Sequence, residues 1–516
     1  MRHNLIETLY GSRLPTAVAI REPGGTCMTT ADLLDRVGRF AAALQHLGVR
    51  PGDRVSFKLE KSIDVVALAH ACFWIGAIAH PLNTGYTLAE TEYLLRDAAP
   101  VLVVCEPEQL PLLGPIVQAI GAALETLGGG GGSLASFAVK ARQTDPALPV
   151  AADHVAALLY TSGTTGKPKG AEITHGNLAQ SARALIEVWK VGVSDVLLHA
   201  LPVYHAHGLL TSLNVLLAGG GAINFLPRFH AGEVSSGLHN STVMMGVPTH
   251  YARLLETPGF ADAIPPQFRL FISGSAPLSA DLASRFLAHT GHTILERYGA
   301  TETAIVTAIP AGTTDRSGWV GWPLPGVEIR LAEPTETGAR SDTDNAVVGV
   351  LETRGHNVFK GYWQHPEANT DAFTIDGWFN TGDLAEIDVN GCVRLLGRTK
   401  DLIISGGLNV YPLEVESILD AIDGVTESAV FGVPHPDFGE AVVAAVIADD
   451  SFDETSLIAA ARIAIAGFKT PKRIVRVDEI PKNRMGKVLK ADLRARFASL
   501  CTRTPISLSA KEEKKP

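Results

Sequence analysis

The stretch LLYTSGTTGKPKG, residues 158–170, joins a short apolar run to six consecutive Ser, Thr and Gly residues and then to two lysines. Small residues let backbone amides come close to phosphate oxygens, and lysine adds positive charge without a fixed geometry. The stretch therefore predicts a phosphate-binding loop. It is no Walker A loop, because Thr161 stands where that motif needs its first glycine and Pro168 where it needs a hydroxyl for magnesium.

Outward from this loop, short apolar runs alternate with amphipathic segments along most of the chain. The runs VLVVC (101–105), VMMG (243–246) and RLFIS (269–273) predict buried strands. Residues 32–48 carry apolar side chains at three- and four-residue spacing and stop at a glycine, which predicts a helix. The alternation predicts an α/β fold with mixed or parallel sheets layered with helices. Functional residues are then expected where strands end.

The composition narrows the class of protein. A chain of 516 residues predicts two or three domains at about 150 residues each. The formal net charge of -10 argues against a nucleic-acid partner. Five scattered cysteines lack metal-ligand spacing and predict free thiols in a reducing compartment. The N-terminus is no convincing signal peptide, and no apolar stretch approaches the length of a membrane span. A cytoplasmic protein without a membrane partner is expected.

A change of organisation is visible near LLGRTKDLIISGGLNVYP, residues 395–412. The following segment predicts a helix, two strands, a second helix, another strand and a basic loop. About a hundred residues suffice for a small α+β domain.

Five motifs occur in the order and spacing typical of one family. They are YTSGTTGKPKG (160–170), YGATET (298–303), NTGDL (380–384), GRTKDLI (397–403) and PKNRMGKV (481–488). The chain thus resembles the adenylate-forming acyl-CoA synthetase family. This resemblance implies a large N-terminal domain (1–398), a hinge (399–400) and a small mobile α+β C-terminal domain (401–500). A disordered tail (501–516) is predicted from its polar composition.

The resemblance also implies where ATP binds. Tyr298 is expected to stack near the adenine, Asp383 to accept the ribose hydroxyls, and Arg398 to contact the nucleotide. The strand end ISGSAPL is expected to line the adenine and acyl pocket through Gly274, Ser275 and Ala276. The residues expected at the ATP phosphates are Thr161, Ser162, Gly163, Thr164, Thr165, Gly166, Lys167 and Lys169.

Four residues are expected to act on the reaction itself. Glu302 is the natural Mg²⁺ ligand, because a carboxylate and substrate phosphates commonly hold that ion. By resemblance, Thr301 contacts the α-phosphate and Lys400 marks the hinge. Lys487, in the basic loop NRMGKV, supplies the cation that lets a carboxylate attack the α-phosphate. Acetylation of Lys487 is expected to silence the enzyme by removing this charge.

The implied reaction has two steps. Carboxylate and ATP give an acyl-adenylate and pyrophosphate, and the thiol of coenzyme A then displaces AMP. Rotation of the small domain is expected to bring the SGGLN turn to the thiol, which assigns CoA binding to Ser405, Gly406, Gly407 and Asn409.

Two arginines indicate which acid is used. Arg253 in VPTHYARLL and Arg297 before Tyr298 lie in segments expected to form the acyl pocket, together with His205 and Gly299. A buried, unpaired guanidinium is costly, whereas a second substrate carboxylate would pair with it. This pattern resembles malonyl-CoA synthetases. The alternative is that the arginines pair locally, for example with Glu296 or Glu256.

Three functions follow from these residues. The leading one is ATP-dependent ligation of malonate to coenzyme A. Ala300 stands where malonyl-CoA synthetases generally have Met, so methylmalonate is a second candidate acid. The alternatives are a CoA ligase for a short-chain or aryl monocarboxylic acid and a stand-alone adenylation enzyme that loads a carrier protein.

Overall fold

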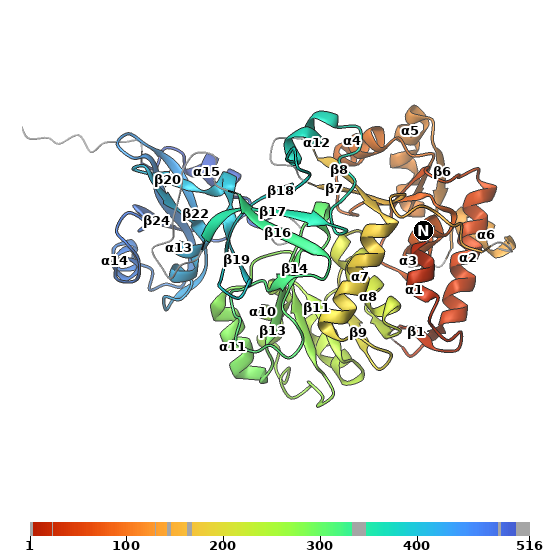
Figure 1. The fold of residues 1–516 in the computed structure, drawn as a ribbon, viewed down its shortest axis with the longest axis horizontal. Helices are drawn as coiled ribbons and strands as arrows, with labels where there is room; N and C mark the ends of the chain where they lie inside the picture. Colours follow the sequence, from red (N-terminus) through yellow and green to blue (C-terminus); the bar gives the residue numbers. More distant parts are fainter. Residues whose placement is uncertain are drawn as a thin grey trace, which may run out of the picture.

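The structure is a computed structural model that describes residues 4–22, 24–129, 131–141, 146–161, 168–332, 347–482 and 487–501. A large N-terminal domain of sheets and helices and a small C-terminal domain make up the chain, with the small domain at one end of the molecule (Figure 1). The mixed α/β fold class predicted from the alternating pattern is confirmed. The predicted tail, from residue 502 onward, lies outside the described residues.

The largest sheet has the strand order β15-β14-β13-β12-β11-β9-β10-β1-β2. Its central strands pair in parallel, and antiparallel pairs form both edges. Its strands are β1 (Val18–Arg21), β2 (Cys27–Thr29), β9 (Val196–His199), β10 (Ala222–Phe225), β11 (Val243–Gly246), β12 (Leu270–Ser273), β13 (Ile294–Tyr298), β14 (Thr307–Ala308) and β15 (Trp322–Pro323).

A second sheet has the order β6-β5-β3-β4-β7-β8 and is parallel except for the pair β7–β8. The phosphate-loop stretch joins these two last strands. Its strands are β3 (Arg54–Lys58), β4 (Ile78–Pro81), β5 (Leu102–Cys105), β6 (Ala123–Thr126), β7 (Val155–Thr161) and β8 (Lys169–Thr174).

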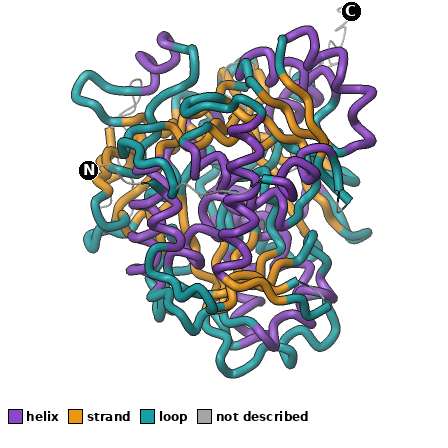
Figure 2. The backbone as a smooth tube through the Cα atoms, turned by 90° about the vertical axis from the view of Figure 1, so that its right-hand side faces the viewer, coloured by secondary structure: helices purple, strands orange, loops and turns teal. Residues whose placement is uncertain are grey.

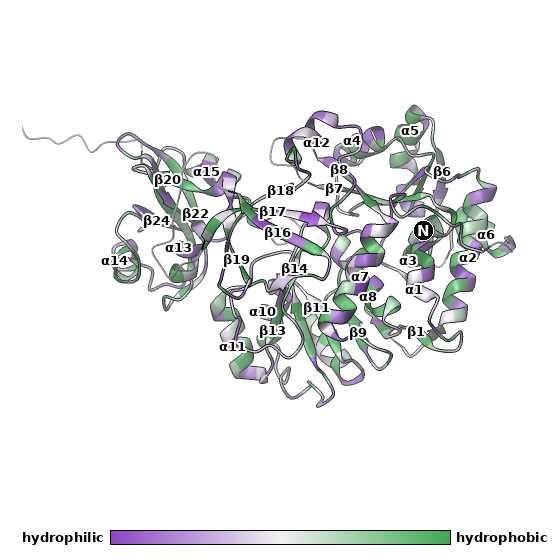
Figure 3. Ribbon diagram, viewed as in Figure 1, coloured by the Kyte–Doolittle hydropathy of each residue, from purple (hydrophilic) through white to green (hydrophobic). Residues whose placement is uncertain are grey.

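Some helices pack in a core between the two sheets, and others cover the outer faces of the sheets. Helix α3 is apolar around its whole circumference, so it is buried on all sides (Figure 3), and it packs with α1, α2, α7 and α8 in a core common to both sheets. The outer faces are covered by α9 to α11 on one sheet and by α4 and α5 on the other. Figure 2 shows how closely helices and strands interleave.

The helices of the large domain begin and end at defined residues. Helix α2 begins at Thr30, where Thr29 and Asp32 form a capping box, which agrees with the helix predicted over 32–48. The helices are α1 (Leu5–Tyr10), α2 (Thr30–His46), α3 (Ile63–Ile75), α4 (Leu88–Ala98), α5 (Leu110–Ile120), α6 (Ser133–Lys140), α7 (His175–Trp189), α8 (Leu213–Ala218), α9 (Ala231–Gly237), α10 (Pro248–Leu255), α11 (Ala280–Thr290) and α12 (Pro366–Ala372).

The described residues also contain five short helical turns. One of them, η2, is a π-helix, a form often found at functional sites. They are η1 (Pro107–Gln109), η2 (Ala206–Ser212), η3 (Leu238–Asn240), η4 (Thr301–Thr303) and η5 (Thr399–Asp401).

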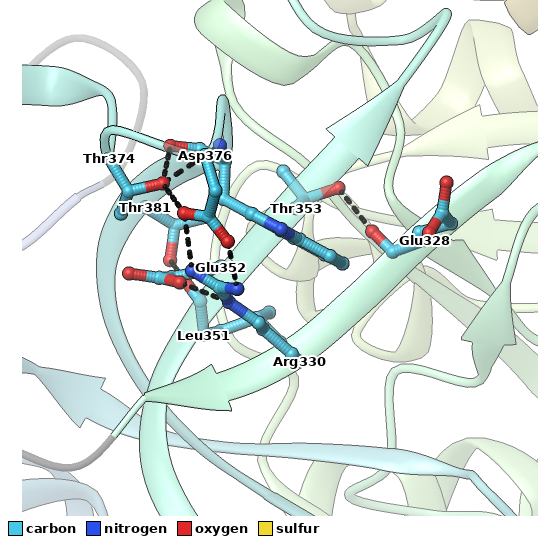
Figure 4. A network of polar contacts seen from close by, with 9 residues as sticks. Glu328, Arg330, Leu351, Glu352, Thr353, Thr374, Asp376 and Thr381 are labelled. Atoms are coloured by element: carbon cyan, nitrogen blue, oxygen red, sulfur yellow. Dashed lines mark hydrogen bonds and ion pairs between the residues drawn. The ribbon is translucent and has the colours of Figure 1, made fainter.

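An antiparallel sheet lies between the large sheets and the small domain in Figure 1. Its strands are β16 (Val327–Ala332), β17 (Val347–Gly355), β18 (Phe379–Ile387) and β19 (Val393–Arg398). Arg330 braces it by pairing with Glu352 at 2.6 Å and with Asp376 at 2.6 Å (Figure 4). Thr381 of β18 also donates to the Leu351 carbonyl at 2.7 Å. These contacts fix β18, which carries Asp383.

The small domain is a five-stranded sheet with a core on each face. Alternate residues of β22 and β23 face opposite sides: Val430 and Val442 pack with α13 and α14, whereas Phe431 and Val443 pack with α15. Its elements are β20 (Ile403–Ser405), β21 (Leu408–Val410), α13 (Pro412–Leu419), β22 (Val425–His435), β23 (Gly439–Ala448), α14 (Glu454–Ala464), β24 (Arg473–Arg476) and α15 (Lys490–Phe497).

Candidate active site

Several of the residues predicted to bind ATP lie at strand ends, as expected for this fold class. Thr161 ends β7, Lys169 begins β8 and Tyr298 ends β13. Gly274, Ser275 and Ala276 follow β12 directly. Residues 162–167, which include Ser162, Gly163, Thr164, Thr165, Gly166 and Lys167, lie outside the described residues.

Asp383 is the centre of one polar cluster. Asp383 and Arg398 face each other across the β18–β19 pair, and Arg398 Nε lies 2.7 Å from Asp383 Oδ1. The Tyr298 hydroxyl donates to Asp383 Oδ2 at 2.5 Å. Burial raises the pKa of Asp383, and Arg398 acts in the opposite direction. Both carboxylate oxygens therefore have a partner within the protein.

Glu302 is the centre of a second cluster, in the turn η4 just after β13. Its Oε1 accepts hydrogen bonds from the Thr161 hydroxyl at 3.1 Å and from the Tyr362 hydroxyl at 3.0 Å. The Lys169 ammonium lies 5.5 Å from the centre of the Tyr362 ring. The phosphate-loop ends and the predicted metal ligand are thus brought together. Tyr362 was missed in the sequence analysis, because no motif marks it.

The carboxylate of Glu302 fits the expected Mg²⁺ ion. No group of three His, Cys, Asp or Glu side chains within the described ranges could hold a metal by itself. One carboxylate together with substrate phosphates is nevertheless a common way to hold Mg²⁺. Glu302 is partly exposed, and both hydroxyls bond to only one of its oxygens, Oε1.

Lys487 of the small domain lies within electrostatic range of the cluster around Asp383. Desolvation of its ammonium, followed by the charges of Arg398 and Lys400, lowers its pKa, while Asp383 and Asp401 act in the opposite direction. The structure therefore brings Lys487 into the electrostatic range of the residue predicted to hold the ribose. Lys400 lies in η5 with its side chain exposed.

Arg297 is a buried cation with unsatisfied donors. Its side chain is only 7% exposed, and its Nε and Nη2 have no hydrogen-bond partner in the described part of the chain. Burial lowers its pKa to about 10. A Cβ on Gly274 would lie 2.4 Å from Arg297 Nε, so the guanidinium packs closely against this glycine. The Arg297 side chain therefore lies directly on the strand end ISGSAPL.

Uncharged histidines surround this guanidinium. Burial and then the charge of Arg297 lower the pKa of His205 to about 4, and the same two causes hold the pKa of His207 well below its usual value. His207 Nδ1 lies 3.2 Å from the Ser275 hydroxyl. These rings are neutral at pH 7, so they add no charge that competes with an anion at Arg297. His207 was not predicted as a site residue; its spacing from His205 was the available signal.

The local pairing alternative fails for Arg297. No ion pair joins it to Glu296 within the described ranges, and burial raises the pKa of Glu296 to about 8. Arg253 was expected to be buried in the acyl pocket. It lies instead in the last turn of α10 and is exposed. No ion pair with Glu256 is seen for it among the described residues.

The structure also shows where two other groups of residues lie, one beside the expected acyl pocket and one in the turn assigned to CoA binding. Gly299 and Ala300 are partly exposed between β13 and η4. Gly406 and Gly407, with φ of 60° and 79°, form the tight turn between β20 and β21, which joins Ser405 to Asn409. The Gly406 N–H donates to the Phe438 carbonyl at 2.8 Å, within the small domain.

A search for membrane-spanning helices among the described residues finds none of sufficient length and apolar character.

Comparison with known proteins identifies the family. A model of AMP-binding enzymes matches residues 10–363, and a model of their C-terminal domain matches residues 414–487. A feruloyl-CoA synthase from an Amycolatopsis species is 36% identical over 494 residues, which cover 94% of this chain and 96% of that protein. The mitochondrial malonate–CoA ligase ACSF3 of Mus musculus is 36% identical over 507 residues, 90% of this chain and 86% of that protein.

A solved structure supports the same family assignment. ATP-bound MatB from Rhodopseudomonas palustris superposes with a TM-score of 0.92 at 43% identity, over 97% of this chain and all of that chain (100%). Fold and site together define the class of adenylate-forming enzymes. The chain belongs to the AMP-binding enzyme family and is an AMP-forming acid–thiol ligase. The resemblance drawn from the five motifs is therefore confirmed.

Proposed function

We propose that this enzyme joins malonate, or a malonate substituted at its central carbon such as methylmalonate, to coenzyme A at the expense of ATP. The observation that carries the proposal is Arg297, a buried guanidinium whose Nε and Nη2 lack partners among the described residues. A distal substrate carboxylate would pair with it bidentately. A monocarboxylic acid would leave this charge uncompensated.

In the first step the proximal carboxylate attacks the α-phosphate and pyrophosphate leaves. Asp383 would hold the ribose, and Arg398, on the neighbouring strand, holds Asp383 in place. Lys487 would neutralise the negative charge between the two reacting anions, and Thr301 would contact the α-phosphate. Mg²⁺, held by Glu302 and the ATP phosphates, would reduce the charge of the leaving pyrophosphate.

In the second step the thiol of coenzyme A attacks the acyl carbon and AMP leaves. For this step we propose that residues 401–500 rotate about a hinge at residues 399–400 against residues 1–398. The rotation would withdraw Lys487 and bring the turn from Ser405 to Asn409 to the thiol. Acetylation of Lys487 would stop only the first step, because it removes the charge. A cytoplasmic location stays a prediction.

A CoA ligase for an aryl monocarboxylic acid is the second candidate, and the similarity to a feruloyl-CoA synthase favours it. Ala300 supports both readings, because a small side chain beside the pocket leaves room for an aryl ring or for a substituent on malonate. Loading of a carrier protein is the third candidate.

Pyrophosphate release from ATP separates these candidates. The panel consists of acetate, malonate, methylmalonate, succinate, benzoate and ferulate, each with coenzyme A and without it. We expect malonate or methylmalonate to give the highest kcat/KM and coenzyme A to permit repeated turnover. A preference for benzoate or ferulate would overturn the assignment of the acid. Turnover with a carrier protein but not with coenzyme A would overturn the assignment of the acceptor.

A further inference from the structure

The segment that carries Lys487 is closed at its base. Lys482 and Val488 form an antiparallel bridge, and the Leu489 N–H donates to the Pro481 carbonyl at 2.8 Å. Residues 483–486 lie outside the described residues. Lys487 is adjacent to this closure, so the position of the closure determines where the Lys487 side chain begins.

A buried ion pair fixes the outgoing end of the segment. Lys490 is the first residue of α15, and its Nζ lies 2.7 Å from Oε1 of Glu416 in α13. Their side chains are only 13% and 11% exposed. The same Glu416 oxygen accepts the Val430 N–H at 2.7 Å, so the carboxylate is held from a second side. Solvent screens such a pair little, and its geometry is well defined.

Two further residues make weaker contacts that also hold this segment in place. At the incoming end, Lys482 Nζ lies 2.6 Å from Glu427 Oε2, with both side chains about one-third exposed. One turn after Lys490, on the same face of α15, Arg494 lies 3.3 Å from Asp401 and donates to the Lys400 carbonyl at 3.3 Å. Helix α15 thus connects the segment that carries Lys487 to the predicted hinge.

We propose that Glu416 and Lys490 are positioning residues for Lys487 and act on adenylate formation alone. The inference rests on the proposed role of Lys487 in the first step. A catalytic group that shifts by about 1 Å can lose about a hundredfold in rate. Loss of the buried pair removes the ion pair that holds Lys490 to α13 at the outgoing end. The thiol step, which does not use Lys487, is unaffected.

The test compares Lys490→Met with Lys469→Met. Lys469 makes a matched control, because its Nζ lies 2.7 Å from Glu414 of the same helix α13, yet it is remote in sequence from Lys487. Each variant is assayed for pyrophosphate release with the preferred acid and for thioester formation from the preformed acyl-adenylate. Thermal melting of each variant reports folding. Lys490→Arg, which keeps the charge, and Lys487→Ala complete the set.

We expect Lys490→Met to lose about tenfold or more in kcat of adenylate formation, with the KM for ATP and the thiol step within about twofold of the original. Lys490→Arg should restore most of the rate, and Lys469→Met should affect neither half-reaction selectively. Equal loss of both half-reactions, with or without a lower melting temperature, would make the pair structural and overturn the inference. Loss in the control equal to that in Lys490→Met would overturn it as well.

Lys487→Ala separates this inference from the proposed function. Loss of adenylate formation in Lys487→Ala but not in Lys490→Met contradicts only the positioning role. Retention of adenylate formation in Lys487→Ala contradicts the proposed function itself.

Discussion

The nucleotide half and the acyl half of the site differ in how their charges are satisfied. In the nucleotide half, Asp383 has Arg398 and Tyr298 as partners, and Glu302 has two hydroxyl donors. In the acyl half, the buried Arg297 has two donor nitrogens without partners among the described residues, and neutral histidines surround it. The charged groups of the first half are paired within the protein, whereas no ion pair is seen for the cation of the second half among the described residues.

This difference indicates which half selects the substrate. A preorganised polar cluster binds its ligand without rearrangement, which suits a nucleotide common to the whole family. A buried charge that only the substrate can satisfy discriminates strongly, because an acid without the matching group leaves the charge unpaired. Specificity for the acid should therefore depend on Arg297 and hardly at all on Asp383 or Glu302.

The largest effect is expected from Lys487→Ala. Lys487 is the cation proposed to lie between the two reacting anions, so adenylate formation should fall by at least about a hundredfold. Thioester formation from preformed acyl-adenylate should change by less than about twofold. Rapid-quench measurement of the two half-reactions checks this, and equal loss of both would contradict the division of labour.

A smaller effect is expected from Asp383→Asn. The amide keeps the shape of the side chain but loses the charge that Arg398 faces, so the KM for ATP should rise by about tenfold. The free energy of unfolding should fall by about 1–3 kcal/mol, measured in a denaturant titration. The KM for the acid should stay nearly constant. A parallel rise in the KM of the acid would show that the two halves are not independent.

The smallest effect is expected from Tyr362→Phe. Glu302 keeps the Thr161 hydroxyl, and the net contribution of one hydrogen bond is about 1 kcal/mol, so kcat should fall by about fivefold. The Mg²⁺ concentration that gives half-maximal rate should change modestly, because the carboxylate loses one restraint. Titration of activity with Mg²⁺ checks this. A loss above about a hundredfold would give Tyr362 a direct catalytic role.

Local patterns in the sequence predicted much of this molecule. The strands at 101–105 and 243–246 and the helix over 32–48 were predictable, because burial and spacing leave a local signature. The motif residues Asp383, Arg398 and Tyr298 do meet in space. A pocket position for Arg297 was predicted from its place just before Tyr298, and the residue is buried.

Contacts between distant segments were not predictable from those patterns. Tyr362 reaches Glu302 across 60 residues, and no spacing rule connects them. Arg253 was expected to be buried, but the direction of the last turn of α10 depends on how that helix packs. The pair Glu416–Lys490 joins helix α13 to the first residue of α15 in the same way. Such contacts depend on the tertiary fold.

The central claim is that Arg297 holds the second carboxylate of the substrate. The most direct measurement is the ratio of kcat/KM for malonate to that for butyrate in Arg297→Met, which keeps the length of the side chain and removes its charge. Loss of a buried charged pair costs about 2–5 kcal/mol, so kcat/KM for malonate should fall by at least about tenfold and up to about a thousandfold. Butyrate should change little or improve.

Arg253→Met is the matched control. Arg253 is exposed, so its side chain must become ordered before it can bind the substrate. Replacement of Arg253 should therefore lower kcat/KM for malonate by about threefold to tenfold, which is less than the effect expected at Arg297. The account predicts a collapse of the malonate-to-butyrate ratio in Arg297→Met. A parallel decline of both acids, with the ratio unchanged, would make Arg297 structural and contradict the account.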